Sequence, residues 1–110
     1  MKELEITDIV VGAGNTVEKG ALVICHYRGT LEDGTEFDSS HTHGRPFQTV
    51  IGVGRVIKGW DQGLIGMKEG GKRKLFVPAH LAYGDRDMGK IKPHSHLNFE
   101  IELIECRPRD

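Results

Sequence analysis

The residues of this chain that could carry chemistry are its six histidines and a small set of aromatic side chains. The histidines are His26, His41, His43, His80, His94 and His96. The motifs HTH and HSH each place two imidazoles two residues apart, so a strand would present both on one face. No cysteine accompanies either pair, and neither spacing fits a zinc site, although adventitious nickel or zinc binding is expected. We therefore predict no physiological metal ion and no cofactor.

The motif DSSH, at residues 38–41, contains the residue types of a hydrolytic triad. Its serines do not follow the strand–turn–helix pattern that exposes a nucleophilic serine. Taken alone, Asp38 is typical of a turn residue. We therefore predict no hydrolytic activity at this motif.

The aromatic residues are Tyr27, Phe37, Phe47, Trp60, Phe76, Tyr83 and Phe99. Trp60, the only tryptophan, lies between Gly59 and Gly63 in a segment with helical periodicity. Glycine inside a helix costs about 1 kcal/mol relative to alanine, so helix formation does not explain why glycine occupies these positions. Either they let the helix approach a sheet closely, with Trp60 in the core, or Trp60 is the floor of a cavity. If the strands curl around the helix, the other aromatic side chains converge on Trp60, as in a small-ligand site.

One segment has the periodicity of a helix, because hydrophobic residues recur in it at spacings of three and four. These residues are Ile57, Trp60, Leu64 and Met67. The residues expected to point away from that face are Lys58, Asp61 and Lys68. The glycine pair at residues 70–71 is expected to end the helix.

The other segments alternate between apolar and polar residues, as half-buried strands do. We expect strands over residues 21–31, 46–52, 71–79 and 97–105, and residues 1–11 also become β-like. The pair Asp33-Gly34 is a strong hairpin signal. The predicted fold class is α+β, an antiparallel sheet with one short helix lying across it.

Length, charge and cysteine content limit the possible functions. The 110 residues suit a single domain, and the near balance of 15 basic and 16 acidic residues argues against nucleic acid as a partner. The basic run KRK, at residues 72–74, is expected on a solvated strand face. No segment resembles a membrane span or a signal peptide. Cys25 and Cys106 indicate a reduced, cytoplasmic protein, and whether they pair stays open.

Four motifs follow one another along the chain: VICHYRGTLEDGTEFDSS, VIKGWDQGLIGMKEGGKRKLFVP, LAYGD and PHSHLNFEIELIE. Together they resemble the FKBP family of peptidyl-prolyl cis-trans isomerases, over residues 17–105. The resemblance implies a curved antiparallel sheet wrapped over one short helix. The short loop after Tyr83 matches the minimal single-domain form, so we expect one isomerase domain over residues 1–110.

The resemblance also implies a pocket for the proline of a substrate. Its lining would be Tyr27, Phe37, Asp38, Phe47, Val56, Ile57, Trp60, Tyr83, Ile91 and Phe99. Trp60 would be the platform for the proline ring, while the Ile57 N–H and the Tyr83 hydroxyl would bind carbonyl groups. The catalytic group would be Asp38, Tyr83, Trp60, Phe37 and Phe99. The expected partners of this monomer are proline-containing peptides, unfolded proteins, and macrolide inhibitors such as rapamycin and tacrolimus.

A few positions depart from the family's usual pattern at the rim of the expected pocket. They are Asp87, Met88, Lys90, and His43, which stands where many relatives carry an arginine. They leave the affinity for macrolides open. Either His43, which titrates, or Arg45, which stays charged, would then support Asp38. The alternative function is a binding module or holdase that keeps the pocket but turns over slowly.

Overall fold

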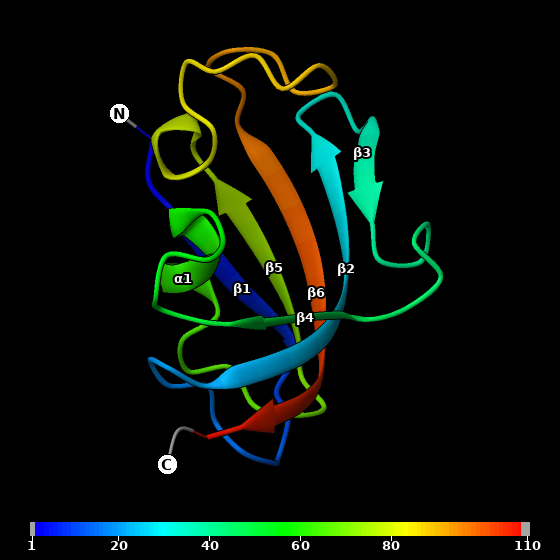
Figure 1. The fold of residues 1–110 in the computed structure, drawn as a ribbon, viewed down its shortest axis with the longest axis vertical. Helices are drawn as coiled ribbons and strands as arrows, with labels where there is room; N and C mark the ends of the chain where they lie inside the picture. Colours follow the sequence, from blue (N-terminus) through cyan, green and yellow to red (C-terminus); the bar gives the residue numbers. More distant parts are fainter. Residues whose placement is uncertain (1, 109–110) are drawn as a thin grey trace.

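The computed structural model describes residues 2–108, which form one antiparallel sheet curved around a short helix (Figure 1). The elements are β1 (Glu5–Val10), β2 (Leu22–Leu31), β3 (Glu36–Ser39), β4 (Phe47–Val50), the helix α1 (Lys58–Gly63), β5 (Lys72–Val77), the 3₁₀ helix η1 (Ala79–Leu81) and β6 (Leu97–Arg107). The strand order is β1-β5-β6-β2-β3, and β4 pairs with β2. The predicted α+β fold is confirmed.

The strand β2 pairs along its length with β6 and changes its other neighbour half-way. Its first half, from Leu22 to Cys25, pairs with β4, and its second half pairs with β3. The register with β6 shifts between Ile24 and Cys25, and such a bulge bends a strand. In Figure 1, β4 crosses in front of β6 and leads towards α1. The bend therefore lets one sheet enclose a core instead of lying flat.

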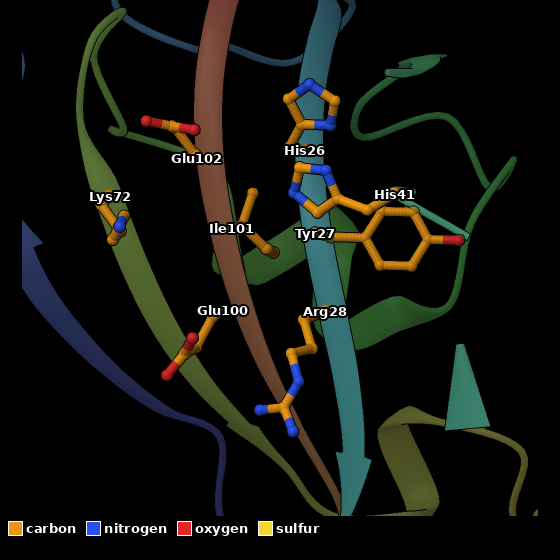
Figure 2. A pocket seen from close by; sticks show the side chains of 8 residues that line it. All are labelled: His26, Tyr27, Arg28, His41, Lys72, Glu100, Ile101 and Glu102. Atoms are coloured by element: carbon orange, nitrogen blue, oxygen red, sulfur yellow. The ribbon is translucent and has the colours of Figure 1, made fainter. Parts of the chain in front are cut away.

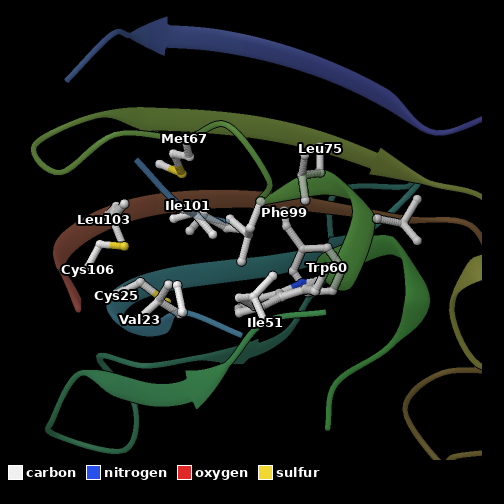
Figure 3. Packing of buried hydrophobic residues seen from close by; sticks show 14 of the residues in the cluster. Val23, Cys25, Ile51, Trp60, Met67, Leu75, Phe99, Ile101, Leu103 and Cys106 are labelled. Atoms are coloured by element: carbon white, nitrogen blue, oxygen red, sulfur yellow. The ribbon is translucent and has the colours of Figure 1, made fainter. Parts of the chain in front are cut away.

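Strand alternation decides which side chains enter that core (Figure 3). On β2, Cys25 is paired with Leu103 of β6, and Tyr27 is paired with Ile101. Cys25, Ile101 and Leu103 are buried, and Tyr27 packs against the same cluster. The inward face expected for residues 21–31 is therefore confirmed.

The helix α1 lies so close to β5 that only glycine fits at two of its positions. A Cβ atom on Gly59 would lie 2.4 Å from Cγ1 of Val77, and one on Gly63 would lie 2.8 Å from Cδ1 of Leu75. These distances are too short for any side chain. The first interpretation of the glycines, close approach to the sheet, is therefore correct.

The helix α1 is shorter than its periodicity predicts. It ends at Gly63, and the chain turns at Gly66, whose φ of 86° is left-handed. Met67 lies beyond the helix and is still buried. Periodicity therefore marks the buried residues correctly but overstates the length of the helix. Neither helix within residues 2–108 is long and apolar enough to cross a membrane.

The KRK run contains a buried cation, so its expected position on a solvated face is wrong for the middle residue. Arg73 is 6% exposed. Its Nε donates to Oδ1 of Asp8 at 2.7 Å, and its Nη1 donates to the carbonyl oxygens of Gly63 and Ile65 at 2.8 and 2.9 Å. Carbonyl groups at a helix end lack partners within the helix. Arg73 therefore joins β1 and β5 to the C-terminal end of α1.

Asp61, which is expected to point away from the apolar face of α1, binds the loop that precedes the helix. Its two carboxylate oxygens accept the N–H groups of Gly52 and Gly54, at 2.7 and 2.9 Å. These bonds hold the loop between β4 and α1 against the helix. That loop carries residues 55–57, which the resemblance places partly at the site.

Cys25 and Cys106 are buried and free. Burial raises the pKa of the Cys25 thiol from 9.0 to about 12. Between pH 9.0 and about 12, the Cys25 thiol keeps its proton in the native state but loses it in the unfolded state. Ionisation therefore favours the unfolded state, and the stability that Cys25 contributes is full below pH 9.0 and is lost as the pH rises towards 12.

We predict that the urea midpoint of unfolding falls between about pH 8.5 and 10.5, and that it falls less in Cys25→Ala. Tyrosine and lysine side chains titrate in the same range, so the comparison of the two slopes is the informative quantity. Equal slopes in the two proteins would contradict the assignment to Cys25.

Candidate active site

A hollow of about 280 Å³ opens beside the N-terminal end of α1. Its lining consists of Tyr27, Phe37, Asp38, Phe47, Arg55, Val56, Ile57, Trp60, Tyr83 and Phe99. The structure brings together every residue expected there except Ile91, which is buried in the core and does not line the hollow. Arg55 is an addition that sequence reasoning missed, because an exposed arginine in a loop carries no pattern. We call this hollow the aromatic pocket.

Trp60 closes the inner end of the aromatic pocket. The rings of Tyr27, Phe47 and Phe99 meet its ring edge-on, with centroids 5.3, 5.8 and 5.5 Å away and interplanar angles of 83°, 81° and 88°. Edge-on aromatic pairs are each worth about 0.5–1.5 kcal/mol beyond the area they bury. Trp60 is 4% exposed, so it is a core residue as well as the cavity floor. The two interpretations of Trp60 are therefore compatible.

Asp38, on β3, is held by three donors. The Tyr27 hydroxyl donates to its Oδ2 at 2.6 Å, while the backbone N–H of Ser39 donates to its Oδ1 at 2.9 Å. The Nε2 atom of His43 also lies 2.9 Å from Oδ1. Partial burial raises the pKa of Asp38, but these hydrogen bonds outweigh it and leave the pKa below the usual 3.8. Asp38 is therefore a fixed carboxylate at neutral pH.

Two donors at the pocket have no acceptor within residues 2–108. The backbone N–H of Ile57 makes no hydrogen bond there, although the Ile57 carbonyl accepts the N–H groups of Trp60 and Asp61. The side-chain hydrogen bonds of residues 2–108 do not include the hydroxyl of Tyr83, and burial followed by the charge of Asp38 raises the pKa of this hydroxyl. The Tyr83 phenol therefore stays protonated at neutral pH. Both donors are available to a bound carbonyl group.

Tyr83 is positioned by the turn that begins at η1. The N–H of Ala79 donates to Nδ1 of His96 at 2.9 Å, and the N–H of Gly84 donates to the Ala79 carbonyl at 2.9 Å. The ring of His96 also packs on Phe76, with centroids 5.6 Å apart. His96 thus supports Tyr83 from outside the pocket, a role that the HSH motif did not reveal.

A family model described as FKBP-type peptidyl-prolyl cis-trans isomerase matches residues 14–104. The match covers β2 to β5, α1 and most of β6, and it includes every residue that lines the aromatic pocket. This chain belongs to that family. The predicted enzyme class, peptidyl-prolyl cis-trans isomerase, is confirmed for this FKBP domain.

Relatives of known name agree with this assignment. The FK506-binding protein of Neisseria meningitidis serogroup A is 50% identical over 106 residues, which are 96% of this chain and 97% of the relative. Peptidyl-prolyl cis-trans isomerase FKBP2 of Homo sapiens is 53% identical over 92 residues, 83% of this chain and 65% of the relative. The crystal structure of AtFKBP13 superposes with a TM-score of 0.85 and 46% identity, over 93% of this chain and 91% of that one.

The histidines of the FKBP domain have separate structural partners. In the HTH motif, the ring of His41 stacks on His26 with centroids 4.4 Å apart, whereas His43 contacts Asp38. The two imidazoles therefore face different neighbours. Among residues 2–108, no group of three or more histidine, cysteine, aspartate or glutamate side chains is arranged to hold a metal ion.

A smaller hollow, of about 160 Å³, lies on the other face of the sheet (Figure 2). Its lining consists of His26, Tyr27, Arg28, His41, Lys72, Glu100, Ile101 and Glu102. Arg28 is paired with Glu100 across the strands, and Lys72 with Glu102. Opposite charges facing each other are typical of a solvated sheet face. Its aromatic side chains are Tyr27 and the stacked imidazoles of His26 and His41, and we assign no site to it.

The loop between η1 and β6 carries the other departures from the family's usual pattern. Asp87, Met88 and Lys90 are exposed, and none of them lines the aromatic pocket. The N–H of Gly89 donates to Oδ1 of Asp87 at 2.9 Å, so this segment is shaped by its own contacts. The departures therefore leave the floor of the FKBP pocket unaltered.

Of the two residues considered as supports for Asp38, His43 makes the contact. Arg45 makes no ion pair with Asp38 in the part of the chain that the structure describes. We predict that His43→Ala weakens FK506 binding about twofold to fivefold, since half-exposed charged contacts are worth less than about 1 kcal/mol. Arg45→Ala is the matched control and should bind as the natural protein does. Equal losses in the two variants, measured by Trp60 fluorescence, would show that His43 has no special role.

Proposed function

We propose that the aromatic pocket binds the proline of X-Pro segments on Trp60 and accelerates rotation about the X-Pro bond in folding proteins. One observation carries this proposal: a nearly buried indole forms the floor of a hollow that also presents two donors without an acceptor in residues 2–108, the Ile57 N–H and the Tyr83 hydroxyl. An apolar ring fits the floor, and the carbonyl groups beside it fit the donors. Pockets with apolar walls and few polar groups are typical of small-ligand sites.

The physical barrier is the partial double bond of the amide, about 18–20 kcal/mol. At the twisted transition state the resonance is lost, and with it much of the amide's charge separation. An apolar pocket therefore disfavours the planar amide relative to the twisted one. Contacts made by the proline ring and the preceding residue help to hold the twist.

Rotation about the X-Pro bond neither makes nor breaks a covalent bond, so no proton has to move. Asp38 is suited to a reaction without proton transfer. Its oxygens are hydrogen-bonded to Tyr27, His43 and Ser39, and its lowered pKa makes it a weak base. Its role in the proposal is to orient Tyr27 and to add a fixed negative charge beside the pocket. Tyr83 adds a hydroxyl dipole from the opposite wall.

Phe37 and Phe99 form the aromatic side of the proposed catalytic group. Their rings meet edge-on at 5.7 Å, and Phe99 also contacts Trp60. Both rings line the pocket, and Phe37 stands beside Asp38 on β3. An apolar side chain before the proline would rest on this side, so we propose a preference for leucine or phenylalanine there.

The same pocket is proposed to take macrolides such as FK506 (tacrolimus) and rapamycin, which would inhibit the enzyme. Proteins named FK506-binding protein are among the relatives, and the pocket floor offers an apolar surface for such a ligand. A monomer in the cytoplasm, acting on proline-containing peptides and unfolded proteins, stays a prediction, as does the single domain over residues 1–110. The buried free thiols agree with a reducing compartment.

The proposal is tested by a protease-coupled isomerisation assay on short peptides with leucine or alanine before proline. We expect turnover well above the uncatalysed rate, which is tens to hundreds of seconds per event, and faster turnover with leucine. Dialysis against a chelator should leave the rate unchanged. A protein that binds the peptides but leaves their rotation at background rate would instead be a binding module or holdase.

A further inference from the structure

A second and larger hollow adjoins the aromatic pocket on the side of η1. Its volume is about 690 Å³. Its lining consists of Gly54, Arg55, Val56, Ile57, Lys58, Asp61, His80, Ala82, Tyr83, Gly84 and Arg86. Arg55, Val56, Ile57 and Tyr83 line both hollows, so the two adjoin along these residues. In Figure 1 the turn that follows η1 stands next to α1, on the side where the chain enters that helix. We call the second hollow the basic groove.

The charges of the basic groove are unbalanced. Arg55, Lys58 and Arg86 are exposed lysine or arginine residues, and none of them has an ion-pair partner within residues 2–108. Asp61 is the acidic residue of the lining, and both of its oxygens already accept backbone N–H groups.

The whole chain has a formal net charge of −1, whereas the lining of the groove holds three cations and one anion, so the rest of the chain carries a net charge of −3. Asp85 and Asp87 flank Arg86 in sequence, but neither lines the groove. The excess of positive charge is therefore local. It lies beside the place where a bound peptide would leave the aromatic pocket.

We propose that the basic groove selects X-Pro segments that carry an acidic side chain close to the proline. The proposal rests on the proposed function of the aromatic pocket. A polypeptide is the fitting occupant, because the groove and the pocket share Ile57 and Tyr83, whose N–H and hydroxyl groups have no acceptor within residues 2–108. Arg55, which belongs to both hollows, is the specificity-determining residue nearest to the proline.

The physical effect is a moderate one that depends on salt. Exposed cations keep their hydration, so each contact with a glutamate contributes less than about 1 kcal/mol. Several cations of one sign around a concave surface nevertheless raise the rate at which an acidic segment arrives. Screening shortens the range of these charges to about 10 Å at 0.1 M salt and about 3 Å at 1 M. The preference for acidic segments should therefore be strong at low salt and weak at high salt.

The test uses Leu-Pro peptides that carry glutamate, glutamine or lysine two residues before or two residues after the proline. On at least one flank we expect kcat/KM for the glutamate peptide to exceed that for the glutamine peptide about threefold to tenfold at 10 mM salt, with lysine lowest. The ratio should approach one at 0.5 M salt. Equal values for all three residues on both flanks would overturn the proposal.

Variants assign the effect to the groove. The triple variant Arg55→Gln, Lys58→Gln, Arg86→Gln should bring the glutamate-to-glutamine ratio close to one. Lys74→Gln removes an exposed cation of β5 that lines neither hollow, and it should leave the ratio unchanged. A ratio that survives in the triple variant would overturn the assignment to these residues.

The same peptides are also titrated against Trp60 fluorescence, which measures binding without turnover. If no peptide is isomerised, the proposed enzymatic function fails, but the order of affinities still decides whether the groove prefers acidic segments. If the glutamine peptide is isomerised and glutamate has no advantage in either measurement, only the groove proposal fails.

Discussion

Replacing Trp60 by leucine is expected to weaken FK506 binding at least about thirtyfold and to lower kcat/KM for Leu-Pro peptides by a similar factor, because truncating a central aromatic anchor costs about 2 kcal/mol or more. Leucine offers no flat surface to a ring. It also loses the edge-on contacts with Tyr27, Phe47 and Phe99, so these walls of the pocket are no longer fixed. Trp60→Phe keeps a flat ring and should give an intermediate loss.

Because Trp60 is also a core residue, replacing it destabilises the fold. The control variant must therefore also be destabilised, at a core residue outside the pocket. Leu64 is 1% exposed on the same side of the core and does not line the pocket. Leu64→Ala should lose about 2–5 kcal/mol of unfolding free energy and retain its affinity for FK506. Calorimetric titration of folded samples compares the variants without using tryptophan fluorescence. Unaltered affinity in folded Trp60→Leu would show that Trp60 is core alone.

Replacing Arg73 by methionine is expected to lower the free energy of unfolding by about 2–4 kcal/mol, because a buried acceptor that is left without its donor costs about 1–3 kcal/mol. Asp8 would lose its partner, and the carbonyl groups of Gly63 and Ile65 would lose their donor. Methionine retains the apolar stem, so the loss reports the guanidinium group. The loss is large against the 5–15 kcal/mol that typically separates folded from unfolded domains.

The neighbouring position supplies a matched control for Arg73. Lys74 belongs to the same KRK run but is exposed on the other face of β5. Lys74→Met should alter the free energy of unfolding by no more than about 0.5 kcal/mol. Urea unfolding measures both variants. Similar losses in the two would contradict the structural role given to Arg73.

Strands and core positions could be read from the sequence because their signal is local. The alternation of residues 21–31 and 97–105 names the inward side chains, such as Cys25 and Leu103, without knowledge of their partners. The pocket residues could not all be predicted from such local patterns. Composition and periodicity single out Trp60 and allow the other aromatic side chains, Tyr83 included, to converge on it, but only the resemblance brings Asp38 to the same place.

The residues that the sequence did not place depend on contacts between distant segments. The guanidinium of Arg73 is buried because β1 supplies Asp8, 65 residues away, and because α1 ends beside it. Asp61 contacts the loop after β4 because that loop presents two N–H groups to it. Arg55 enters the pocket through the course of that same loop. Neither hydrophobic periodicity nor charge pattern predicts such contacts between distant segments.

The central claim is that one pocket, built on Trp60, both binds ligand and accelerates X-Pro rotation. The most direct measurement titrates FK506 into the enzyme while recording isomerisation of a Leu-Pro peptide and Trp60 fluorescence in the same samples. We predict that catalysis is lost in proportion to the fluorescence change, and that both changes are complete at one ligand per protein. Full catalytic activity in a sample whose fluorescence shows a saturated site would contradict it.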